Sequence, residues 1–132
     1  MDELEALANA IRAAENRLER TITIRRAAEN EKAYVVGWPD GMCVTGSRTR
    51  IDWADNAFVV GREGLANHFR QVIDLKHFPR QTGAPTVMDF KAMLDIAIES
   101  QQAGLKCMKA VIGEMLRASG LPLTGLALRR VL

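Results

Sequence analysis

An apolar run, a tight turn and a second apolar run follow one another along residues 33–45. Residues 33–38 (Ala-Tyr-Val-Val-Gly-Trp) are rich in β-branched and aromatic side chains, and residues 42–45 (Met-Cys-Val-Thr) form a shorter run. Between them lies Pro39-Asp40-Gly41, in which proline presets φ and glycine accepts a positive φ. This pattern predicts an antiparallel β-hairpin, which excludes an all-helical bundle. We expect a third strand within residues 51–60, with residues 57–60 as its strongest part.

Helical periodicity dominates the sequence on both sides of this hairpin. Residues 2–20 place one apolar side chain on the same helix face at every turn. These seam residues are Leu4, Leu7, Ile11, Ala14 and Leu18. Further helices are predicted over residues 62–77, 87–102 and 105–118. Residues 86–89 resemble a capping box for the 87–102 helix, and Gly104 is expected to end or bend it.

Together these patterns predict an α+β, predominantly helical fold. A small antiparallel β-hairpin or three-stranded sheet would pack on three to four helices. We expect a single domain over residues 1–132, since a chain of 132 residues can bury a core without disulfides. Its parts would be an N-terminal amphipathic helix (1–31), a hairpin region (33–60) and a helical region (62–132) with an apolar C-terminal tail.

Composition and charge exclude several classes of protein. Hydrophobic residues make up 48% and charged residues 26%, with a net charge of +2, which is typical of a globular protein and not of a disordered one. The two cysteines, Cys43 and Cys107, form no Cys-x-x-Cys pair, so we expect no metal and no cofactor. The acidic N-terminus is unlike a signal peptide and no apolar run is long enough to span a membrane. We therefore expect a cytoplasmic protein with no membrane partner.

The hairpin region offers side chains of the types that dominate protein interfaces. Tryptophan and arginine are enriched among interface hot spots. The candidate partner-binding residues are Trp38, Met42, Arg48, Arg50 and Trp53. Our first hypothesis is a small non-enzymatic binding or regulatory protein that acts through a protein–protein interface. Its size and composition suggest an inhibitor of a host machine, encoded by a phage or mobile element.

The narrow seam of residues 4–18 is open to two interpretations. It could pair with a second copy of itself and make the protein a homodimer, or it could dock on the core of its own chain.

A nucleic-acid-binding module is the second hypothesis. Arginine doublets and a basic stretch over residues 100–132 could contact phosphates, and such contacts give an affinity that falls as salt is added. The candidate residues are Arg25, Arg26, Lys106, Lys109, Arg117, Arg129 and Arg130.

A third hypothesis comes from two short acidic pieces. Pro39-Asp40 lies between candidate strands, and residues 72–76 read Val-Ile-Asp-Leu-Lys. Together they resemble the signature of the PD-(D/E)xK nucleases. The resemblance implies that Asp40 and Asp74 bind Mg²⁺ and that Lys76 assists the attacking water. It also requires residues 72–76 to lie on a strand beside the first piece, whereas their apolar spacing favours a helix. We therefore lean away from an enzyme.

Overall fold

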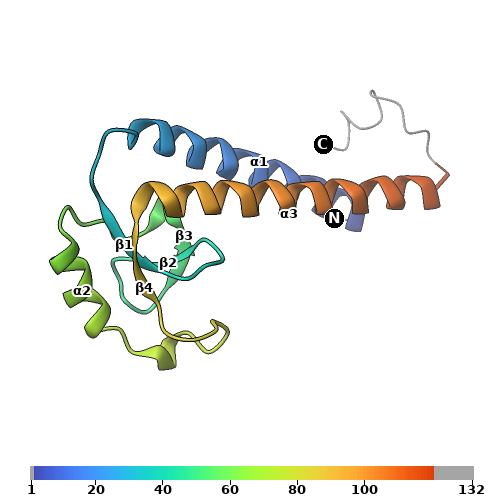
Figure 1. The fold of residues 1–132 in the computed structure, drawn as a ribbon. Coiled ribbons are helices and arrows are strands. Elements are labelled where there is room, and N and C mark those ends of the chain that lie inside the picture. Colours follow the sequence, from blue (N-terminus) through green and yellow to red (C-terminus); the bar gives the residue numbers. More distant parts are fainter. Residues whose placement is uncertain (1, 121–132) are drawn as a thin grey trace. The chain divides into compact units, whose positions relative to one another are not determined.

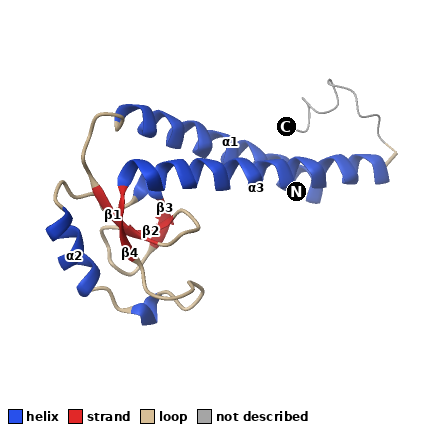
Figure 2. Ribbon diagram, in the orientation of Figure 1, coloured by secondary structure: helices blue, strands red, loops and turns tan. Residues whose placement is uncertain are grey.

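The computed structural model describes residues 2–120 and has an α+β, mostly helical fold, which confirms the predicted fold class. Figure 2 shows the helices in blue and the strands in red. The helices are α1 (Glu3–Ala27), α2 (Glu63–Gln71) and α3 (Phe90–Ala118), and the short 3-10 helices are η1 (Ala54–Asn56) and η2 (Leu75–His77). The strands are β1 (Tyr34–Gly37), β2 (Met42–Val44), β3 (Ile51–Trp53) and β4 (Thr86–Asp89).

The described chain divides into two compact units. The helical unit comprises residues 2–19 and 101–120, and the sheet unit comprises Arg20–Ser100. The long helices α1 and α3 each contribute residues to both units. None of the helices within residues 2–120 combines the length and the apolar character needed to span a membrane.

The four strands form one antiparallel sheet in the order β3-β2-β1-β4. The predicted hairpin is its centre, because β1 pairs with β2 through the turn at Pro39-Asp40-Gly41. The amide of Trp38 donates to the carbonyl of Met42 over 2.9 Å. Gly41 has a φ of +93°, so the turn uses the conformational freedom that the sequence predicts for this position.

Both faces of the sheet are covered, which explains why β1 is a continuous apolar run. Val35 and Cys43 pack in one core cluster with Met93 and Leu94 of α3. Val36 and Val44 belong to a second cluster with Trp38 and Phe78, against which Phe69 of α2 packs. Successive strand residues point to opposite faces, so each strand supplies both clusters. Figure 1 shows α2 beside the sheet, and α2 contacts β1 and β4.

The core of the helical unit lies between the first part of α1 and the last part of α3. Ala8 and Ile11 of α1 are buried with Leu105 and Ile112 of α3. The remaining seam residues pack against this cluster; they are Leu4, Leu7, Ala14 and Leu18. Within the described chain, the seam therefore docks on α3, which is the second of the two interpretations given above.

The C-terminal half of the fold differs from the sequence prediction in two places. Residues 86–89 form strand β4, paired with β1 from Tyr34↔Asp89 to Gly37↔Thr86, so the sheet has four strands instead of two or three. The predicted capping box is displaced by three residues, because Asp89 and not Thr86 precedes the helix, and the Asp89 carboxylate accepts a hydrogen bond from the Ala92 amide over 3.1 Å. The two helices expected around Gly104 are one continuous helix, α3.

Two other boundaries were predicted wrongly, and the end of the first helix, which the sequence left open between residues 20 and 31, is defined by the structure. α1 continues to Ala27 through the β-branched residues 21–24, because buried Thr21 and partly buried Ile24 face the core and tertiary contacts outweigh a small loss of helix propensity. α2 ends at Gln71, and the chain turns before η2. The third strand is β3 at 51–53, whereas residues 57–60 contribute only an isolated bridge between Val60 and Tyr34. The apolar tail, residues 121–132, lies outside the described residues.

Candidate partner-binding surface

Helix α2 leaves large apolar side chains in solvent. Leu65 is 56% exposed and Val72, at the C-cap, is 46% exposed. Their spacing places both on the helix face that includes Phe69. On the other side, Ala66 is buried and Ile73 packs in the cluster of Trp38 and Phe78, so the helix is attached to the sheet by a neighbouring stripe. The apolar stripe of α2 is thus wider than the part that the sheet covers.

Phe58 extends this apolar stripe away from the helix. Its ring lies 4.7 Å from the ring of Phe69, centroid to centroid, with 39° between the ring planes. Phe58 remains 41% exposed, while its amide donates to the carbonyl of Val44 and holds the segment on β2. We define the α2 surface as Phe58, Leu65, Phe69 and Val72. Two further exposed side chains, Val59 and Leu75, follow Phe58 and Val72 in the chain.

The charges around the α2 surface are mostly positive. Within residues 58–82, the cations Arg62, Arg70, Lys76 and Arg80 outnumber the acids Glu63 and Asp74. All of these side chains are exposed. Arg62 is the N-cap residue of α2, and Lys76 follows its C-terminus within η2. A cation therefore lies near each end of the helix, Arg62 beside Glu63 and Lys76 after Asp74, with Arg70 between them.

The structure places the five predicted partner-binding residues in different environments. Trp38 is only 2% exposed, and its indole N–H donates to the Gly83 carbonyl over 3.0 Å. This corrects the expectation of a surface anchor, because an apolar ring with one satisfied donor belongs in the core. Met42 and Trp53 are half-buried, whereas Arg48 and Arg50 are exposed in the turn between β2 and β3.

The predicted nucleic-acid residues are distributed over both units. Arg25 and Arg26 lie in the sheet unit, and Lys106, Lys109 and Arg117 lie in the helical unit. Arg129 and Arg130 lie outside the described residues. Lys109 lies 4.0 Å from the Glu15 carboxylate, and Arg117 pairs with Glu114. These two cations are therefore partly neutralised by acids of their own unit.

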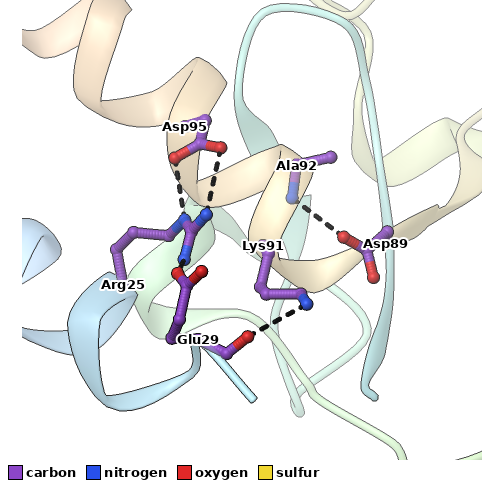
Figure 3. A network of polar contacts seen from close by, with 6 residues as sticks. All are labelled: Arg25, Glu29, Asp89, Lys91, Ala92 and Asp95. Carbon is purple, nitrogen blue, oxygen red and sulfur yellow. Dashed lines mark hydrogen bonds and ion pairs between the residues drawn. The ribbon is translucent and has the colours of Figure 1, made fainter. Parts of the chain in front are cut away.

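Arg25 is held in the ion-pair network shown in Figure 3. Its guanidinium donates to Asp95 of α3 over 2.8 Å and also pairs with Glu29. These hydrogen bonds, first to Asp95 and then to Glu29, raise the pKa of Arg25. Lys91 of α3 donates to the Glu29 carbonyl over 3.1 Å. The network joins the end of α1 to the start of α3, so Arg25 has a structural role in this arrangement.

The acidic pieces that resemble a nuclease do not meet the structural requirement of that resemblance. Residues 72–76 form a turn after α2 and the start of η2, and not a strand. The Asp74 carboxylate accepts from the Lys76 amide, and the Asp40 carboxylate accepts from the Met42 amide, each over 3.0 Å. Both acids thus stabilise local turns. Within residues 2–120, no group of three or more His, Cys, Asp or Glu side chains is arranged to hold a metal ion, so the residues do not fit Mg²⁺.

Comparisons with known proteins give no relatives. No family model matches the chain, and neither a curated protein nor a solved structure shows significant similarity to it. The geometry of the described residues is therefore the basis for the function proposed below.

Sequence reasoning did not find the α2 surface. The spacing of Leu65, Phe69 and Val72 marks an apolar helix face, and such a face is predicted to be core. The signal that could have indicated it is the width of the apolar face. Ala66 and Ile73 form a second apolar stripe beside Leu65, Phe69 and Val72, and one face of a small sheet does not cover both stripes. Only the position of α2 on the sheet shows that Phe69 and Ile73 pack against the core while Leu65 stays exposed.

Proposed function

We propose that this protein is a small non-enzymatic binding protein that holds a protein partner on the α2 surface. The observation that carries the proposal is the set of apolar side chains exposed on and beside one face of α2, where Leu65 is 56%, Val72 46% and Phe58 41% exposed. Contiguous apolar groups kept in water on a folded protein typically mark an interaction site. This proposal keeps the first hypothesis from the sequence, but the α2 surface replaces the buried Trp38 as the place where the partner binds.

The base of this surface is well supported, which favours recognition without large rearrangement. Phe69 and Ile73 pack against the buried cluster of Val36, Trp38, Val44 and Phe78. Phe58 is held by the hydrogen bond that its amide donates to the Val44 carbonyl. A preformed apolar surface loses less conformational entropy on binding than a flexible one.

The charge around the surface indicates the chemistry of the partner. An apolar stripe with Arg62 and Lys76 near the two ends of its helix complements a segment with apolar side chains at its centre and acidic side chains at its ends. An amphipathic acidic helix has these properties and fits a groove or stripe by its apolar face. We further propose that binding of this segment to the α2 surface regulates the partner, in the way that an inhibitor does.

The test compares two glutamate variants in binding. Leu65→Glu places a charge in the α2 surface, while Val111→Glu is the matched control, because Val111 is 51% exposed but lies in the helical unit. Proteins captured from the source cell by the wild type, after nuclease treatment, are quantified against both variants. The leading candidate is then purified and titrated against each variant by calorimetry.

We expect Leu65→Glu to weaken binding at least tenfold, since a buried unpaired charge costs more than about 1.4 kcal/mol. Val111→Glu should bind like the wild type. Equal binding by the two variants would contradict the α2 surface. Capture that disappears on nuclease treatment would favour the nucleic-acid hypothesis and its basic residues instead.

A further inference from the structure

A small cavity lies in the sheet unit, separate from the residues that define the α2 surface. Its volume is about 260 Å³, slightly below the range of typical ligand pockets. Two segments form its walls. One is the end of the β2–β3 turn with the start of β3, and the other is the last residue of η2 with the segment that follows it. The lining residues are Thr49, Ile51, His77, Phe78, Pro79, Arg80 and Gln81.

The floor of the cavity is apolar and firmly held. Phe78 is 6% exposed and packs edge-on against Trp38, with ring centroids 5.4 Å apart. The Trp38 indole anchors the following loop through its hydrogen bond to Gly83, and the Gln81 amide donates to the Phe78 carbonyl over 3.2 Å. Trp38 does not line the cavity, but it packs against the lining residue Phe78 and helps to fix its position.

Each polar side chain of the lining can donate a hydrogen bond, and Arg80 can only donate. Arg80 carries a permanent positive charge, and His77, Gln81 and Thr49 can each donate through a side-chain N–H or O–H. None of the described side chains that line the cavity is acidic. Thr49 is flanked in the chain by Arg48 and Arg50, both exposed. The one permanently charged side chain in the lining is therefore the cation Arg80.

From this combination we infer that the cavity binds a carboxylate attached to a small aromatic or aliphatic body. The apolar body lies on Ile51, Phe78 and Pro79, and the carboxylate accepts from Arg80, since arginine matches the planar geometry of a carboxylate. Two sources share this chemistry: a free aromatic acid, and a C-terminal apolar residue of a protein. The inference does not depend on the α2 surface, because different residues form the two sites.

Titration of the labelled protein followed by amide NMR tests the inference directly. Benzoate represents the free acid and N-acetylphenylalanine represents a C-terminal residue. Benzyl alcohol and N-acetylphenylalaninamide are the neutral counterparts. We expect saturable shifts at the amides of the lining residues with both acids and at least fivefold weaker binding of both neutral compounds. The tighter of the two acids identifies the source.

Arg80→Gln should weaken acid binding at least fivefold, while Arg26→Gln, which removes an exposed arginine from the last turn of α1, should leave it unchanged. Arg80→Lys restores the charge without the planar fork and should bind with intermediate affinity. The NMR spectrum of each variant also reports that it is folded. Equal affinity for acids and neutral compounds, shifts that map to other residues, or no effect of Arg80→Gln would each overturn the inference.

Discussion

At the scale of single residues, the two cysteines show how burial controls the reactivity of a thiol. Cys43 is fully buried beneath α3, and this burial, together with the negative charges of Asp40 and Asp55, raises the pKa of its thiol to about 12. Cys107 is exposed on α3. Because the thiolate is the reactive form, Cys43 should be inert in the folded protein, while Cys107 stays open to alkylating reagents.

The raised pKa of Cys43 makes the stability of the protein depend on alkaline pH. Below about pH 9 the thiol is protonated in both the folded and the unfolded chain, so its contribution is constant. Between pH 9.0 and about 12 the unfolded chain loses this proton and the folded chain keeps it, which lowers the free energy of unfolding. We expect an extra decrease that approaches about 1.4 kcal/mol per pH unit above pH 10.

Urea unfolding of the wild type and of Cys43→Ala between pH 7 and 10.5 measures this contribution. The quantity of interest is the difference between the two proteins, because contributions that they share cancel in it. Their difference in unfolding free energy should be constant up to about pH 8.5 and should shrink above pH 9. Cys107→Ala should parallel the wild type. Parallel curves for the wild type and Cys43→Ala would show that the thiol does not titrate differently on folding.

At the scale of elements, α3 is one helix although its sequence contains two interior glycines. Gly104 and Gly113 both lie within Phe90–Ala118. A glycine in a helix interior costs about 1 kcal/mol relative to alanine, and the buried contacts of Leu105 and Ile112 offset this cost. The helix is therefore held by packing and not by propensity at these positions.

Gly104→Ala should raise the free energy of unfolding by about 0.5–1 kcal/mol. A Cβ at this position meets no atom within 4 Å, and the backbone is helical, so alanine adds helix propensity without a clash. Chemical denaturation of the variant measures the change. Gly37→Ala is the opposite control, because a Cβ there would lie 2.7 Å from the Met42 carbonyl oxygen and should destabilise the protein. A destabilised Gly104→Ala would indicate that the helix is interrupted at this residue.

The sequence was informative about elements where the signal was local. The turn residues Pro39-Asp40-Gly41 and the flanking apolar runs predicted the β1–β2 hairpin correctly. Strand β4 was missed because Thr86–Asp89 is short and Asp89 also carries a real capping signal for α3. What decides its strand conformation is pairing with β1, a contact between residues distant in sequence. Such pairing has no local signature.

The candidate sites depended even more on distant contacts. Tryptophan is common at interfaces, which makes Trp38 a predicted partner-binding residue. In the structure it instead packs on Phe78 and donates to the Gly83 carbonyl. The cavity brings Thr49 and Ile51 together with residues 77–81, and no spacing along the chain predicts that meeting. Exposure and proximity are properties of the tertiary structure, whereas residue type and periodicity are all that the sequence supplies.

At the scale of the whole molecule, the two units differ in how their secondary structure is held. In the sheet unit, β1 lies between β2 and β4, and its residues Val35 and Val36 are each 1% exposed. Both faces of this strand are packed. In the helical unit, each helix buries one face, and the cluster contains Ala8, Ile11, Leu105 and Ile112. The sheet unit thus has the larger core of the two.

This difference predicts unequal protection of amide hydrogens from exchange. Amides of β1 should exchange only through global unfolding, because they are bonded and covered on both faces. Amides near Ile11 and Ile112 should exchange through local openings of lower free energy, since a pair of helices with a small shared core is only marginally stable by itself. Native-state hydrogen exchange with increasing urea separates the two cases. The amides of β1 should show the full urea dependence of global unfolding and those of the helical unit a smaller one. Identical free energies and urea dependences throughout residues 2–120 would mean that the two units open as a single cooperative structure.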